Sequence, residues 1–382
     1  MQLNQPSDAD PALPRSRGGV EATLAAALAT ALMPLSLNVW AESAPTRGTA
    51  SVKSLNYQDS QPGSSRVRVG AQAFYVMMPV AEDWTYATTA TVDAISGASP
   101  YVQDRVLTRL RDERRALDTR VTKYLPWGTT SVGANVSTEA DYLSRGLSWQ
   151  STWSDPSRNT TWTVGLGHNR DVINPITKVV KDEKKVVTNV LMGLTWAAST
   201  VDLMQVNVAF SRGRGYHSDP YKFADDRPRQ RDAQTLLVRW NHHQATCGCT
   251  WRSSWRYFRD DWGVRSHTVG LELHGQVGDW KLSPQLRLYS QTAAAFYTPP
   301  SESTYPFVPF EPIRYSEDHR LSAFGAATVG FKVSRTFAQD WTADFKYERY
   351  EQRGAWAFIG QGTQGLLPFE ARSIQVGLSR SF

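Results

Sequence analysis

The chain has 382 residues and a formal net charge of +6, and charged residues make up 20% of it. Its mean hydropathy is polar at -0.44 despite 14 Trp, 15 Tyr and 14 Phe, and no run of about 18 apolar residues follows the N-terminal segment, so a helical membrane protein is excluded. The charge is modest for this length and forms no basic stripe interleaved with aromatic residues, which argues against a nucleic-acid partner.

The first 41 residues are predicted to be an export signal. Two arginines, Arg15 and Arg17, precede an apolar run over residues 20–37, and small residues then stand where a signal peptidase would cut, ending at Ala41. We therefore expect cleavage after Ala41 and a mature domain of residues 42–382. A buried helix of the mature domain is the alternative for this segment.

From about residue 50 the sequence becomes a succession of segments in which apolar and polar residues alternate. Each has roughly 9 to 13 residues, the length that a tilted strand needs to cross a membrane. We predict about sixteen strands, near residues 50–57, 65–77, 84–94, 116–125, 129–138, 142–153, 159–168, 185–196, 200–211, 231–243, 249–259, 264–275, 280–291, 319–334, 340–351 and 371–382.

The predicted connections are of two kinds, which largely alternate. Tight turns rich in Gly, Pro and Asp are separated by longer loops, near 95–115, 169–184, 212–230, 292–318 and 352–370. Short turns on one side and long loops on the other are typical of bacterial outer-membrane barrels, with periplasmic turns and extracellular loops. A soluble β-propeller is the alternative, but its repeat of about 40 to 50 residues is absent from the sequence.

Charged residues share one face of many predicted strands. The alternation points Val67, Val69, Ala71 and Ala73 towards lipid and the charged residues between them into the interior. An excess of guanidinium groups in the lumen would favour anionic solutes, whereas charges that pair across the lumen would plug it. The residues predicted to face the lumen are Arg66, Arg68, Asp93, Arg120, Arg239, Arg252, Arg256, Arg287, Asp344, Lys346 and Glu348, with Asp118 and Glu272 as further acidic partners.

The last ten residues alternate strictly. Ile374, Val376, Leu378 and Phe382 fall on one face, and serine, glutamine and glycine fall on the other. A strand that ends on Phe resembles the C-terminal signal that the barrel-assembly machinery reads in outer-membrane barrel proteins, although Arg380 stands where such signals carry an apolar residue. The last strand of an ordinary antiparallel sheet is the alternative.

Cys247 and Cys249 are the only cysteines, and Gly248 alone separates them. We expect them to be solvent-facing thiols in a turn, because the spacing is too short for an ordinary relaxed disulfide. A zinc site would need His242 and His243 as additional ligands. We therefore predict neither a metal nor a cofactor.

Three further segments are candidates for function. Ser96, Gly97 and Ser99 are predicted to form a packed turn on the first long loop, and a nucleophilic serine is the alternative, although no base is near in sequence. His217 and Asp219 could perform acid–base chemistry or bind a metal at the rim, but we expect instead that Asp219 and Pro220 start a turn and that His217 is a satisfied loop residue. The Pro-rich segment 298–312 is the candidate for an inward constriction.

Several long motifs resemble a domain-of-unknown-function family of predicted bacterial outer-membrane barrels: VDAISGASP at 92–100, GYHSDPYK at 215–222, RWNHH at 239–243 and KYERYEQRG at 346–354. The resemblance implies the fold and the outer-membrane location, carries no catalytic residues, and is weakly associated with a periplasmic redox or flavin-related partner.

We therefore predict an all-β transmembrane antiparallel barrel that acts as a passive, porin-like channel or as the barrel component of an envelope assembly. Outer-membrane lipid and the barrel-assembly machinery are its expected partners. A rim hydrolase that uses His217 and Asp219, and a scaffold for a periplasmic redox partner, are the alternatives.

Overall fold

The computed structural model describes residues 43–102, 106–222, 224–299, 302, 314–338 and 340–382. This part of the chain forms sixteen strands: β1 (Thr49–Gln61), β2 (Ser64–Ala81), β3 (Trp84–Val102), β4 (Val106–Leu125), β5 (Gly128–Thr138), β6 (Tyr142–Ser154), β7 (Thr160–Ile173), β8 (Glu183–Ala197), β9 (Asp202–Gly215), β10 (Gln230–Gln244), β11 (Cys249–Asp260), β12 (Arg265–Val277), β13 (Trp280–Gln291), β14 (Phe324–Phe337), β15 (Trp341–Arg353) and β16 (Phe369–Ser381).

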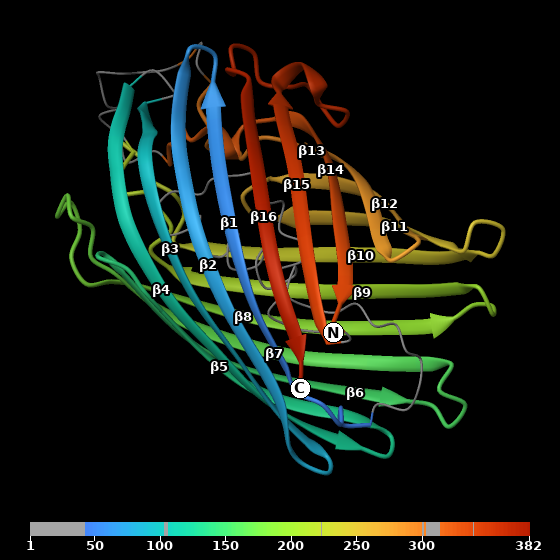
Figure 1. Ribbon diagram of the computed structural model, residues 1–382. Helices are drawn as coiled ribbons and strands as arrows, with labels where there is room; N and C mark the ends of the chain where they lie inside the picture. Colours follow the sequence, from blue (N-terminus) through green and yellow to red (C-terminus); the bar gives the residue numbers. More distant parts are fainter. Residues whose placement is uncertain (1–42, 103–105, 223, 300–301, 303–313, 339) are drawn as a thin grey trace.

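Each strand pairs antiparallel with its neighbours in sequence, and β1 pairs with β16, which closes the barrel (Figure 1). The closing ladder runs from Thr49 opposite Ser381 to Ser60 opposite Glu370. The predicted fold class is confirmed. The first strand is longer than the prediction of 50–57, because the polar residues at 58–61 also pair with β16 or β2.

The alternation of the strands separates two environments. On β1, Lys53 is 3% exposed and points into the barrel, whereas Val52 is 39% exposed on the outer surface. Large apolar side chains that remain exposed on most other strands form the outer band that lipid would cover. Aromatic side chains are among them near the turn side, including Trp84, Trp127, Trp153, Trp162, Trp280, Phe337 and Phe382.

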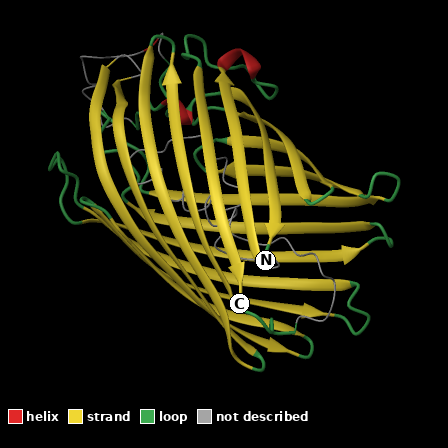
Figure 2. Cartoon of the chain, viewed as in Figure 1, coloured by secondary structure: helices red, strands yellow, loops and turns green. Residues whose placement is uncertain are grey.

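The connections differ in length at the two ends of the barrel (Figure 2). At the end where β16 terminates they are tight turns, as predicted for the periplasmic side. At the other end lie longer segments, of which residues 216–222, 224–229, 292–299, 314–323 and 354–368 are described, with two short 3₁₀ helices, η2 (His319–Leu321) and η3 (Gly354–Trp356). Among the described residues, no helix is long and apolar enough to cross a membrane.

One loop prediction and one strand start are wrong. Residues 95–102 and 106–115 are paired strand rather than loop, so Ser96, Gly97 and Ser99 are β3 residues that pair with β2 or β4. Residues 319–321 form η2 and do not begin β14, because the Asp318 side chain accepts a hydrogen bond from the Arg320 backbone and starts a helical turn.

The prediction for β2 assigned its two faces the wrong way round. Val67, Val69, Ala71 and Ala73 are buried inside the barrel, and Arg68 is exposed on the outer surface. The four apolar residues pack in an interior cluster with side chains such as Leu55, Tyr289, Phe324, Tyr350 and Phe369. Alternation alone does not say which face meets lipid, and here the apolar face turns inward.

The two cysteines form a disulfide in the turn between β10 and β11, which corrects the expected free thiols. Their Cα atoms are 5.2 Å apart, within the usual range for a disulfide. Gly248 allows this reversal because it adopts a φ of 58°, a value that other residues rarely take. The predicted export signal, residues 1–41, and most of the Pro-rich segment 298–312 lie outside the described residues.

Candidate functional site

One part of the inner wall is rich in arginine. Arg239 on β10, Arg252 and Arg256 on β11 and Arg287 on β13 occupy inward positions on neighbouring strands. Glu272 on β12 lies opposite Arg252 in the register and contacts His274 at 2.9 Å. We call these four arginines the basic wall.

The cross-strand neighbours of the basic wall leave room for its long side chains. Ser254 lies opposite Arg239, and Gly270 lies opposite Arg287. A Cβ at Gly270 would come within 2.7 Å of the Ser254 hydroxyl. The absence of a side chain at position 270 therefore leaves space beside Ser254 on the inner wall. Small neighbours allow guanidinium groups to extend along the wall into the lumen.

Other inward charges have close partners of opposite sign. Asp93 contacts Arg114 at 2.7 Å, and Asp344 lies 3.6 Å from Lys53 and 3.9 Å from Lys332. Asp93 and Arg114 balance each other, whereas Asp344 has two lysines near it. The basic wall adds four further positive charges to the interior, with Glu272 opposite Arg252.

The extracellular end of the barrel is narrowed by the segment 314–323. The Gln291 side chain donates to the backbone oxygens of Arg320 and Ser322 at 2.9 and 2.6 Å, and the His319 ring stacks on Phe369 with ring centres 6.2 Å apart. Gln291 and Phe369 are buried inward residues of β13 and β16. The segment therefore lies inside the ring of strands.

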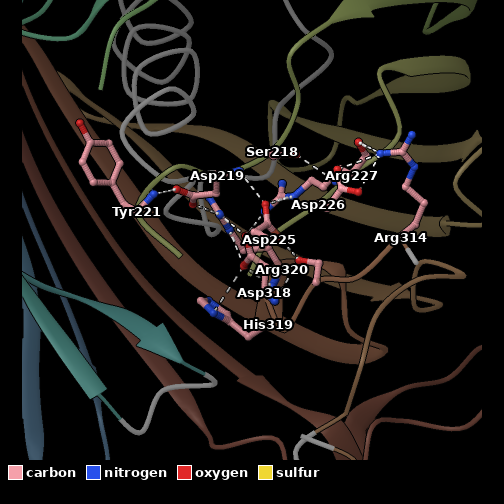
Figure 3. Close-up of polar contacts among 11 residues, drawn as sticks. Ser218, Asp219, Tyr221, Asp225, Asp226, Arg227, Arg314, Asp318, His319 and Arg320 are labelled. Atoms are coloured by element: carbon pink, nitrogen blue, oxygen red, sulfur yellow. Dashed lines mark hydrogen bonds and ion pairs between the residues drawn. The ribbon is translucent and has the colours of Figure 1, made fainter. Parts of the chain in front are cut away.

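A network of buried ion pairs joins this segment to the segment 216–229 (Figure 3). Arg227 contacts Asp225 at 2.8 Å and Asp318 at 2.7 Å, and Arg320 contacts Asp219 at 3.0 Å. Arg320 also donates to Asp318 from Nε at 2.7 Å. We call these five residues the mouth lock.

The charges of the mouth lock reinforce one another. Burial alone would raise the pKa of Asp318, but the neighbouring Arg320, with Lys222 and Arg227, holds it well below its usual range. Burial would lower the pKa of Arg320, and Asp318 and Asp219 raise it instead. The opposite shifts of Asp318 and Arg320 favour their charged forms, and this ion pair helps to hold the two segments together across the opening.

One carboxylate of β4 and two of the loop after β5 form a cluster that contacts the segment 216–229. Ligand atoms of Asp112, Glu139 and Asp141 lie within 4.8 Å of one another, and such oxygen donors suit a hard divalent cation. Tyr221, on the segment 216–229, donates a hydrogen bond to Asp141, and the Ile176 backbone donates to the Tyr221 hydroxyl at 3.0 Å. The cluster is thus part of the packing between extracellular loops.

The sequence matches the family model described as "Protein of unknown function (DUF3570)" over residues 102–181 and 176–373. The chain belongs to this family. No match was found among curated proteins.

Solved structures with the same fold are similar to this DUF3570 chain. A bacterial polysaccharide outer membrane secretin is 7% identical, with a TM-score of 0.52, over 88% of this chain and 99% of that one. The siderophore receptor PirA from Pseudomonas aeruginosa is 10% identical, with a TM-score of 0.45, over 88% and 80%. OccK3 (OpdO) from Pseudomonas aeruginosa is 9% identical, with a TM-score of 0.44, over 89% and 96%. The DUF3570 chain is an outer-membrane β-barrel.

The structure separates the predicted lumen residues of this DUF3570 chain into groups. Arg66 is buried against Asp59 and over the Phe369 ring, and Arg68 is outside the barrel. Arg120 shares the inward face of β4 with Asp118. Lys346 and Glu348 contact each other at 3.0 Å.

His217 and Asp219 take part in different contacts. Asp219 accepts hydrogen bonds from the Tyr221 backbone at 3.0 Å and from Arg320 at 3.0 Å, so both of its carboxylate oxygens have partners. His217 packs edge-on against Trp262, with ring centres 5.6 Å apart. Burial, with Lys185 and Arg231, lowers the pKa of His217 to about 4. The pair predicted for hydrolysis is thus divided between the mouth lock and an aromatic contact.

Sequence reasoning missed most of the mouth lock in this DUF3570 chain. Asp225, Arg227, Asp318 and Arg320 stand in loop segments without strand alternation, and their partners are distant in sequence. The Asp-Pro turn at Asp219 was the one available sign that the loop was structured. Arg114, the partner of Asp93, was missed because it fell within the predicted loop 95–115, whereas it is a residue of β4.

Proposed function

We propose that the protein is a passive diffusion channel that favours small anionic solutes. The observation that carries the proposal is the basic wall, in which four inward arginines lie on three strands and Glu272 stands opposite one of them, Arg252. Charges that line a pore set its selectivity, because a permeating ion passes within a few ångströms of them.

The dimensions and the mouth support the same proposal. A barrel of about sixteen strands is wide enough to enclose a water-filled channel. The mouth lock then limits the size of solutes at the extracellular end, and the basic wall below it determines the preferred sign of charge. Both elements belong to the rigid barrel or are held to it by hydrogen bonds.

The proposal is tested by measuring the reversal potential of single channels in planar bilayers under a salt gradient. The native protein should conduct in discrete steps and prefer chloride over potassium. The double variant Arg252→Gln with Arg287→Gln should lower the ratio of anion to cation permeability about fivefold, the effect of about 1 kcal/mol for a charge about 4 Å from the ion in water.

Arg380→Gln is the matched control. Arg380 is exposed on the outer face near the periplasmic end of β16, next to the Trp341 ring. Its loss should leave the permeability ratio unchanged. A correctly folded protein without conductance, or an equal change in both variants, would contradict the proposal.

A further inference from the structure

A belt of basic side chains surrounds the outer face of the barrel above its apolar band. On β16, exposed Val376 and Ile374 are followed towards the extracellular end by exposed Arg372, and on β7 exposed Leu166 is followed by exposed Arg170. Other strands repeat this order. The members of the belt are Arg68, Arg115, Arg145, Arg170, Lys184, Arg212, Arg259, Arg265, Arg349 and Arg372, all exposed.

Part of the belt borders a groove on the outer face of β8 to β12. The groove has a volume of about 730 Å³. Val190 and Phe210 give it an apolar lower part, and Arg212, Arg259 and Arg265 line its extracellular rim. Apolar and cationic surfaces therefore meet in one concave site at the height where the lipid band ends.

The arginines of the rim are held in place. Arg259 donates to the Gln234 side-chain oxygen at 3.0 and 2.7 Å, a neutral partner that fixes the guanidinium without cancelling its charge. Arg212 contacts Asp232 at 3.1 Å, with the Arg212 side chain exposed and that of Asp232 partly buried. Asp260 and Asp261 also line the groove, so three guanidiniums stand with three aspartates, of which Asp260 has a fully buried side chain paired with Arg231.

We propose that this groove binds a phosphate-bearing, acylated lipid of the outer leaflet. Guanidinium groups form bidentate hydrogen bonds with phosphate, and the apolar part beneath them offers a surface for an acyl chain. A soluble anion would use only the rim, and a neutral lipid only the apolar part. An amphiphile with phosphate above acyl chains matches both parts in the order in which the strands present them.

The groove lies outside the lumen, so this inference does not depend on the proposed channel. It is tested with full-length protein in detergent by native mass spectrometry and by titration with bis-phosphorylated lipid A. The same lipid after enzymatic removal of its phosphates, and inorganic phosphate alone, serve as comparison probes. Only the phosphorylated lipid should bind tightly.

The double variant Arg259→Gln with Arg265→Gln should weaken binding of the phosphorylated lipid about a hundredfold, since each lost charged hydrogen bond is worth about a factor of ten or more. Arg335→Gln is the control, because Arg335 lies at the periplasmic end of β14 beside Asp279 and the Trp280 ring. Heat-modifiable migration on a gel verifies folding of every variant.

Unchanged affinity in the double variant would overturn the proposal. An equal loss with Arg335→Gln would also overturn it, since binding would then reflect total charge. Tight binding of the dephosphorylated lipid would show that the arginines do not contribute to lipid binding. Tight binding of inorganic phosphate would show that the apolar part of the groove does not contribute.

Discussion

Arg227 is a single side chain that holds two loop segments together. It is buried between Asp225 and Asp318. Replacing it with Met leaves buried Asp225 without its ion-pair partner and Asp318 with Arg320 alone, and breaking a buried ion pair typically costs about 3–5 kcal/mol. We expect the free energy of opening of the segment 216–229, measured by hydrogen exchange, to fall by that amount.

The control for this variant is Arg314→Met. Arg314 contacts Asp226 at 2.8 Å, but both side chains are about half exposed, and such a pair contributes at most about 1 kcal/mol. Equal losses of protection in the two variants would show that Arg227 does not have a special role in holding the mouth.

His217 should make the mouth sensitive to pH. Its pKa falls from 6.5 to about 4 in the folded protein, through burial and through Lys185, Arg231 and Arg227. An opened segment therefore binds a proton below about pH 6.5, whereas the closed mouth does so only near pH 4. The closed mouth should lose stability as the pH falls from 6.5 to 4, with no further loss from this group below 4.

His217→Phe separates this effect from the titration of nearby carboxylates. Phe keeps the edge-on contact with Trp262 but cannot bind a proton. Burial raises the pKa of Asp225, and that contribution should remain in both proteins. Hydrogen exchange in segment 216–229, corrected for its intrinsic pH dependence, should differ between the two proteins within this window. Identical pH profiles would exclude the role of His217.

At the scale of the strand, β16 offers a test of its lipid-facing side. Val376 is exposed on the outer face and lies opposite Phe345 on β15. Val376→Arg should destabilise the folded barrel in lipid vesicles by about 2–4 kcal/mol in urea titrations if the site lies near the middle of the bilayer. Ser379→Arg, on the inward face of the same strand, should cost much less, and equal losses would contradict the assignment of the faces.

The strands could be predicted because alternation and turn residues are local properties. The alternation of β16 was sufficient to give the outward positions of Ile374, Val376 and Leu378. It failed for β2, because a cluster inside the barrel gathers Val67 and Ala71 with Phe324 from a strand far along the chain. No local pattern records which face that cluster will occupy.

For the molecule as a whole, the two parts of the candidate site differ in how far the sequence predicted them. The basic wall could be predicted from strand alternation, because Arg252 and Arg256 are four residues apart on β11 and therefore lie on the same face. The mouth lock did not, because Arg227 and Asp318 are 91 residues apart and meet only through the closed topology. The sequence shows which charged residues are present, but the closed topology of the barrel determines which of them form ion pairs.

The mouth lock has a consequence for biogenesis. Arg227 follows β9, and its partner Asp318 precedes β14, so every strand from β10 to β13 must be in place before they can meet. A chain in which these strands have not yet assembled therefore lacks the contact between Arg227 and Asp318. Protection of the segment 216–229 would then report that a newly inserted chain has assembled its strands from β10 to β13.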